Sequence, residues 1–146
     1  MPHYALLSIP AMWLTALYPH AHAVSLIKNA NNNKWDNTNS KGSAWSATLQ
    51  KSVPTEVLAR FERAEAAHRN GLENLPFFGL AVLCAEWAGV PETTVGVSAW
   101  AFVASRLVYN ALYLNTTDLK KSFARSGVWA VSTLICLSLF VQAALQ

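Results

Sequence analysis

The chain has 146 residues, of which 53% are hydrophobic and 13% are charged, and its formal net charge is +3. That length is typical of a single domain. The sequence shows no basic face interleaved with aromatic side chains, which argues against nucleic acid as the reason for the positive charge.

The apolar residues gather in blocks. Residues 4–27 contain no Asp, Glu, Lys or Arg, residues 93–114 contain only Arg106, and residues 126–145 contain none. A bilayer core about 30 Å thick takes about 20 helical residues, and each of these blocks reaches that length. A fourth block, 75–90, reaches it only if its helix continues back through the stretch ERAEAAHRNGLENLPFFG (62–79).

We therefore predict an all-α integral membrane protein, a four-helix bundle that forms a single transmembrane domain over residues 1–146. The membrane spans are expected at about 4–28, 55–88, 92–114 and 123–145. A cleaved signal peptide is disfavoured for the first block, because the apolar region is too long and lacks a basic start and a cleavage site. A soluble bundle is disfavoured because the last block has only Ser, Thr and Gln for a polar face.

The basic residues predict the orientation, because Lys and Arg accumulate on the cytosolic side of a membrane. Neither terminus has any Lys or Arg. The group between the first two blocks is Lys28, Lys34, Lys41, Lys51, Arg60, Arg63 and Arg69, and the group between the last two is Lys120, Lys121 and Arg125. Loops 29–54 and 115–122 are thus expected in the cytosol, with both termini on the other side. The sequon at Asn115 would then carry no glycan.

The cysteines and two of the histidines suggest no disulfide and no metal site. Cys84 and Cys136 both fall inside predicted spans, where we expect inert thiols. His20 and His22 are two residues apart and point to different faces of a helix. The sequence places no carboxylate or third histidine beside them, so a metal site is not expected.

Polar side chains at membrane depth are costly and by default mark a functional site. In the span 55–88, Arg69 and Glu73 are four residues apart and share one face of the helix. Asn70 and Asn74 form a second row directly beside that pair. The sequence therefore predicts a polar shelf where the helix enters the bilayer.

Two further polar sets are expected near the same leaflet. In the span 92–114, Arg106, Tyr109 and Tyr113 are three and four residues apart and form one stripe. Arg125 and Ser126 stand where the last span enters the membrane. The three sets can converge inside the bundle.

Each set also has a purely structural interpretation. Arg69 and Glu73 could be a helix-stabilising pair, and Arg106 could hold the bundle together by pairing with Glu62 or Glu73. The two tyrosines could belong to an interfacial aromatic belt, and Arg125 could be a topology anchor. The coincidence of all three sets at one depth favours a site.

The motifs resemble those of the MAPEG family, the membrane-associated proteins in eicosanoid and glutathione metabolism. ERAEAAHRNGLENLPFF, with Asn70, Glu73 and Pro76 at its core, is similar to the family's second-helix signature. RLVYNALY (106–113) resembles its third-helix pattern, and ARSGVW (124–129) its fourth-helix entry. Microsomal glutathione transferases and prostaglandin E synthase belong to this family.

The resemblance implies a homotrimer in the endoplasmic reticulum membrane that holds glutathione between neighbouring subunits and acts on a lipophilic substrate. The family's glutathione contacts map onto Arg69, Asn70, Glu73, Tyr109, Tyr113, Arg125 and Ser126. Guanidinium groups suit the two carboxylates of glutathione. Arg125, with Ser126 beside it, is the candidate for stabilising the thiolate.

The chain also departs from the family pattern. Ala66 stands where a basic residue is usual, Lys28 or Lys34 replaces an arginine at the end of the first helix, and Tyr109 replaces a histidine of the prostaglandin synthase. Two alternatives therefore stay open beside a glutathione transferase, peroxidase or isomerase. One is a glutathione-independent isomerase or cyclase in the same intersubunit cavity, and the other is a non-catalytic lipid-binding scaffold.

Overall fold

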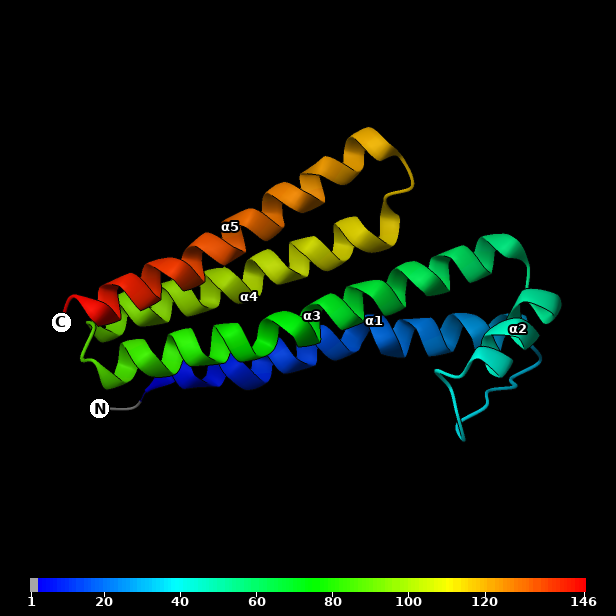
Figure 1. The fold of residues 1–146 in the computed structure, drawn as a ribbon, viewed down its shortest axis with the longest axis horizontal. Helices are drawn as coiled ribbons and strands as arrows, with labels where there is room; N and C mark the ends of the chain where they lie inside the picture. The colour runs from blue at the N-terminus through cyan, green and yellow to red at the C-terminus, as the bar shows by residue number, and fades with distance from the viewer. Residues whose placement is uncertain (1–2) are drawn as a thin grey trace.

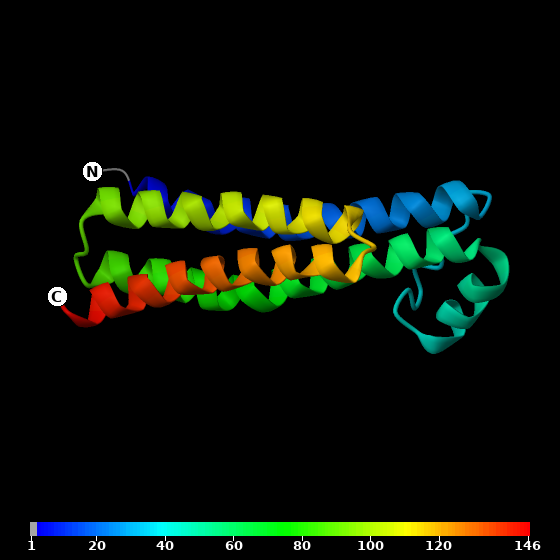
Figure 2. The same ribbon diagram turned by 90° about the horizontal axis from the view of Figure 1, so that it is seen from above.

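The computed structural model describes residues 3–146, and every regular element in that range is helical. Four long helices form an elongated bundle, with both termini at one end and the short helix α2 at the other (Figures 1 and 2). The elements are η1 (Tyr4–Leu7), α1 (Ser8–Ala30), α2 (Ser43–Ser52), α3 (Thr55–Trp87), α4 (Glu92–Asn115) and α5 (Leu119–Ala144).

The two middle helices of the chain hold the bundle together. α3 packs against α1, α4 and α5, and α4 packs against α1, α3 and α5. At the end that holds α2, the α1–α3 pair projects beyond the turn between α4 and α5, so the bundle has a step there (Figure 1). Because α3 and α4 each contact α1, α5 and one another, their polar side chains can meet those of every other long helix.

The predicted loop 29–54 is partly helical. α1 runs to Ala30, and α2 follows within the loop. The physical reason is a small second core at this end, in which Leu49 of α2 packs with Ile27, Val53 and the partly buried Trp35. The Asn- and Ser-rich composition of the loop concealed these few well-spaced apolar residues.

The last helix begins at Leu119, four residues before the predicted start of the span. Asp118 caps it, and its side chain accepts hydrogen bonds from the backbone N–H groups of Lys120 and Lys121 at 2.7 and 3.2 Å. An aspartate in this position satisfies donors that the first turn of a helix leaves free. The predicted loop 115–122 therefore shrinks to a short turn.

Helices α4 and α5 are each long and apolar enough to cross a bilayer. α1 and α3 have sufficient length, but the first half of α3 is rich in charged residues, and the four-span arrangement stays a prediction. Among the described residues, large apolar side chains are exposed along the bundle, for example Leu134, Leu137 and Val141 of α5. Such surfaces are suited to contact with lipid or with another copy of the chain.

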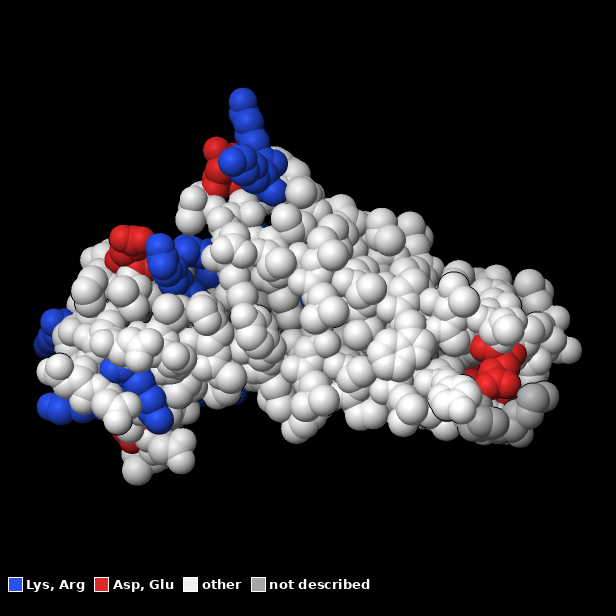
Figure 3. Space-filling view, turned by 180° about the vertical axis from the view of Figure 1, so that it is seen from behind, with Lys and Arg blue, Asp and Glu red and all other residues white. Residues whose placement is uncertain are grey.

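Charge is unevenly distributed along the bundle. Lys and Arg gather at the α2 end, the middle of the face in Figure 3 is almost free of charge, and an acidic patch lies at the end that holds the termini. Glu86 near the end of α3 and Glu92 at the start of α4 lie at that end. The structure thus collects the two basic groups of the sequence at one end.

Polar contacts between helices gather near Pro19, in the middle of α1. Proline has no N–H, so the Thr15 carbonyl loses its partner within the helix. The Asn110 side chain of α4 donates to that carbonyl at 2.9 Å. One residue further on, His68 of α3 donates from Nδ1 to the carbonyl of Ala16 at 2.7 Å. Both contacts are buried and join α1 to its two neighbours.

Gly71 allows α1 and α3 to approach closely at this point. A Cβ atom on Gly71 would lie 2.7 Å from the Cβ and 3.1 Å from the Cα of Ala16. Neither atom belongs to a flexible side chain that could move away. Further along α3, Phe78 stacks on Phe102 of α4 with ring centroids 4.1 Å apart.

We expect Gly71→Ala to lower the free energy of unfolding by about 2 kcal/mol, because the added methyl group must push α1 and α3 apart. Gly96→Ala is the matched control, since a Cβ there meets no atom within 4 Å. It should raise stability by about 0.5 kcal/mol through helix propensity. Thermal unfolding in detergent, followed by circular dichroism, measures both. Equal stability of the two variants would contradict the close packing at Gly71.

Candidate functional site

A pocket of about 340 Å³ lies between α3, α4 and α5. It is lined by Asn70, Tyr109, Tyr113, Arg125, Ser126 and Trp129. All of the predicted site residues except Arg69 and Glu73 are thus brought together from three helices. The volume falls at the lower end of the range for small-molecule sites.

Two arginines and two tyrosines form a continuous row of contacts beside this pocket. The Arg106 guanidinium lies 4.0 Å from the centroid of the Tyr109 ring, and that of Arg125 lies 3.9 Å from the Tyr113 ring. The two tyrosine rings meet edge to face at 5.6 Å. Cation–π contacts hold both guanidinium groups at fixed positions. The stripe predicted on α4 is therefore joined to the entry of α5.

Arg106 is the most constrained member of this row. Arg106 is only 1% exposed. Its Nη2 donates a hydrogen bond to Oδ1 of Asn70, which joins α4 to α3. Asn74 also donates from Nδ2 to Asn70, to the backbone oxygen at 2.8 Å and to Oδ1 at 3.4 Å. Since Oδ1 accepts from both neighbours, the Nδ2 group of Asn70 is left to donate to a ligand. Glu62 and Glu73 are both exposed, and Arg106 pairs with neither.

The remaining predicted residues lie on other faces of α3. Arg69 lines a separate cavity of about 540 Å³ together with Ala66, the position where the family has a cation. Glu73 is exposed and lines none of the cavities described here. Consecutive helical residues point about 100° apart, and here Asn70 lines the pocket whereas Arg69 lines the other cavity.

Trp129 belongs to the pocket but was not among the predicted residues. It is four residues after Arg125, which puts both side chains on the same face of α5. This spacing is the signal in the sequence that could have identified it. The indole gives the otherwise polar pocket one large apolar wall, 42% exposed.

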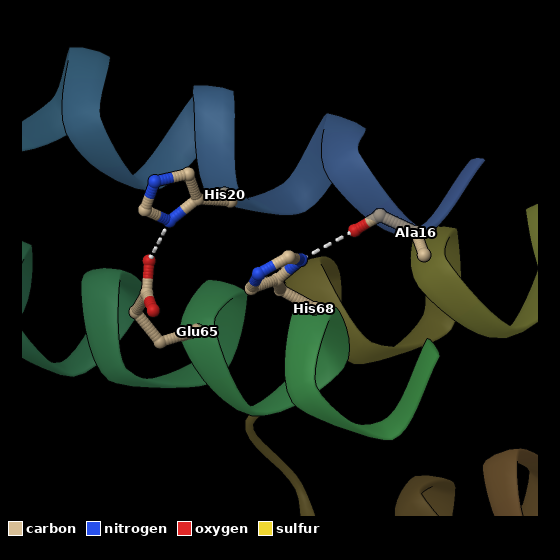
Figure 4. Close-up of polar contacts among 4 residues, drawn as sticks. All are labelled: Ala16, His20, Glu65 and His68. Atoms are coloured by element: carbon tan, nitrogen blue, oxygen red, sulfur yellow. Dashed lines mark hydrogen bonds and ion pairs between the residues drawn. The ribbon is translucent and has the colours of Figure 1, made fainter. Parts of the chain in front are cut away.

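A second polar cluster joins α1 and α3 (Figure 4). Nδ1 of His20 lies 2.6 Å from Oε1 of Glu65, and the His20 and His68 rings lie 5.0 Å apart. The fold thus places a carboxylate and a further histidine next to His20, which the sequence pattern did not reveal. Even so, no group of His, Cys, Asp and Glu suited to a metal ion lies within residues 3–146. His22 lies on another face, beside Tyr18.

The arrangement of these motifs can be compared with known proteins. The model of the MAPEG family matches residues 4–145, nearly the whole chain. The chain belongs to the MAPEG family. No curated protein and no solved structure shows a significant match.

Membership of the MAPEG family indicates a membrane protein with a role related to glutathione or to lipid metabolism. The two apolar helices α4 and α5 agree with a membrane location. Within this MAPEG chain, Cys84 and the buried Cys136 are free thiols, and neither lines the pocket.

We expect Asn70→Ala to lower the free energy of unfolding by about 3 kcal/mol, because it leaves the buried Arg106 guanidinium without a hydrogen-bond partner. Asn74→Ala is the control, and should cost about 1 kcal/mol. Combining Asn70→Ala with Arg106→Met should recover part of the loss, because the uncompensated charge is removed. Denaturant unfolding of the parent protein, Asn70→Ala, Arg106→Met and the double variant measures the coupling. Additive losses would contradict the proposed dependence of Arg106 on Asn70.

Proposed function

We propose that the protein is a membrane-bound, glutathione-dependent enzyme of the transferase, peroxidase or isomerase type that acts on a lipophilic substrate. The observation that carries this proposal is the pocket in which Asn70, Tyr113, Arg125 and Ser126 converge. Membership of the MAPEG family supports the same chemistry. Glutathione, when bound, supplies a nucleophilic thiolate.

Arg125 is the residue to which we assign stabilisation of that thiolate. A cation close to a thiol favours the charged form and lowers its pKa. The Tyr113 ring holds the guanidinium in place, and Ser126 offers a hydroxyl donor next to it in the same pocket. Asn70 offers an amide donor to the peptide part of the ligand.

Arg69 and Glu73 support a site shared between subunits. Both are exposed and neither lines the pocket of its own chain, so they are available to a ligand held between two copies. A guanidinium can bind a carboxylate of glutathione, and a carboxylate can bind its amino group. We therefore propose a homotrimer with glutathione at the intersubunit contact.

The lipophilic substrate would reach the pocket from the bilayer. Trp129 forms an apolar wall of the pocket and is also exposed on the outer surface of α5. Exposed apolar residues such as Val131 and Leu134 follow along the same helix. We place the protein in the endoplasmic reticulum membrane, with the basic end of the bundle in the cytosol.

Arg125→Ala should lower thiol-dependent turnover by about 100-fold or more while leaving the oligomer intact, because an electrostatic contact to the reacting group is lost. Lys120→Ala removes a cation from the first turn of the same helix, outside the pocket, and should keep near-normal turnover. Steady-state kinetics and size-exclusion chromatography provide the measurements. Unchanged turnover in Arg125→Ala would refute the role of this residue.

Isothermal titration calorimetry of glutathione separates the enzyme classes. We expect binding in the millimolar range or tighter, weakened in Arg125→Ala by the loss of a charge-assisted contact. Turnover of a lipophilic substrate without glutathione, together with no heat of binding, would instead favour a glutathione-independent isomerase.

The orientation is tested by labelling single introduced cysteines, in protein with Cys84→Ser and Cys136→Ser, in sealed microsomes with a membrane-impermeant maleimide. Lys121→Cys, at the basic end, should react at once, and Glu92→Cys, at the opposite end, only after permeabilisation. Because the basic end is expected in the cytosol, Asn115 should carry no glycan. A glycan on Asn115, or early labelling of Glu92→Cys, would reverse the orientation.

A further inference from the structure

A third cavity, of about 700 Å³, shares no residue with the candidate site. It lies at the step of the bundle, where α4 ends against the flanks of α1 and α3 (Figure 1). Its polar lining comes from all three helices and the turn after α4: Tyr18, His22, Glu56, Arg60, Arg63, Asn115 and Thr117. None of these side chains has a role in the glutathione chemistry proposed above.

The cavity has an excess of positive charge. Arg60 and Arg63 face one carboxylate, Glu56, whose Oε1 lies 2.8 Å from Nη2 of Arg60. Both members of that pair are more than half exposed, so the pair is weak and can exchange partners. Arg63 carries a buried Nε atom that has no hydrogen-bond partner within residues 3–146. A buried donor without a partner is costly, and no carboxylate within residues 3–146 forms a salt bridge with Arg63 to offset its charge.

The other polar groups of the cavity can also donate. Tyr18 and Thr117 offer hydroxyl groups, and the His22 imidazole stacks near the Tyr18 ring at 6.3 Å. Asn115 uses one Nδ2 hydrogen on the Ala111 carbonyl and retains the other. Several donors around two guanidinium groups match the oxygens of a phosphate group, which only accept.

The position of the cavity points to the source of the phosphate. The cavity is lined by arginines of the basic end of the bundle. Beyond that end, the face in Figure 3 is almost free of charge. Leu114 is part of its wall, and exposed Leu107 is two turns away on the same face of α4. On α1, exposed Leu14 is one turn from Tyr18. An apolar track thus leads from the polar cavity towards the centre of the bundle.

We propose that this cavity binds the phosphate headgroup of an anionic membrane lipid, with Arg60 and Arg63 at the phosphate and the acyl chains along Leu14 and Leu107. Basic pockets between membrane helices are suited to such headgroups. The cavity lined by Arg69 is less suited, because Glu62 and Glu65 balance the charges of Arg69 and Lys41 there.

The test uses purified full-length protein in an uncharged detergent, with phosphatidylglycerol or phosphatidylcholine of the same acyl chains added. Phosphatidylglycerol should raise the unfolding temperature more than phosphatidylcholine does. In Arg60→Gln/Arg63→Gln this preference should vanish, with apparent affinity falling about tenfold for each arginine. Lys120→Gln/Lys121→Gln removes the same charge outside the cavity and should keep the preference.

Two further arms complete the experiment. Arg63→Lys keeps the charge but loses the planar fork, and native mass spectrometry should show fewer retained phosphatidylglycerol molecules in it than in the parent protein. Inorganic phosphate is added alone in parallel. A shift equal to that with the lipid would overturn the lipid as the source and leave a soluble phosphate ligand. An equal loss of the preference in both double variants, or no preference in the parent protein, would overturn the proposal.

Discussion

The fold depends on how the bundle satisfies a backbone carbonyl that α1 cannot satisfy itself. Because Pro19 lacks an N–H, the Thr15 carbonyl has no partner within its helix, and in an apolar setting that would be costly. The Asn110 side chain of α4 donates a hydrogen bond to this carbonyl, and His68 of α3 donates one to the carbonyl of Ala16. These two bonds fix both neighbours of α1 at the same height.

The candidate site follows from that arrangement. Once α3 and α4 are held at a common level, Asn70 and Arg106 meet in the interior. The buried guanidinium orders the Tyr109 ring, and the contact of Tyr109 with Tyr113 extends this order to Arg125 at the entry of α5. A chain of contacts therefore runs from the Pro19 region to the residue that we assign to the thiolate.

The three cavities differ in the balance of their charges, and this difference separates their roles. The pocket with Arg125 contains a cation and donors but no carboxylate. The cavity with Arg69 combines cations with Glu62 and Glu65, so it is the least selective for anions. The cavity with Arg63 is basic and opens beside apolar surface. The two ligands that we propose, a thiol and an anionic lipid, would therefore bind at separate places.

The sequence determined the helical class and the family, because long blocks without charge and three ordered motifs are local properties. It also identified seven candidates for one site, of which all but Arg69 and Glu73 line the pocket: Arg69, Asn70, Glu73, Tyr109, Tyr113, Arg125 and Ser126. The tertiary structure decided which of the polar residues on α3 face that site. Adjacent residues on a helix point in different directions, and only packing determines which direction is inward.

Contacts between residues distant in sequence were likewise decided by packing. Glu65 and His68 lie beside His20 because α1 and α3 approach closely at Gly71, a distance that spacing in the sequence cannot supply. Helix α2 forms within the predicted loop because Leu49 packs against Ile27. Local sequence patterns thus determine which residues form each helix. The partners of its buried polar groups depend instead on where the other helices lie.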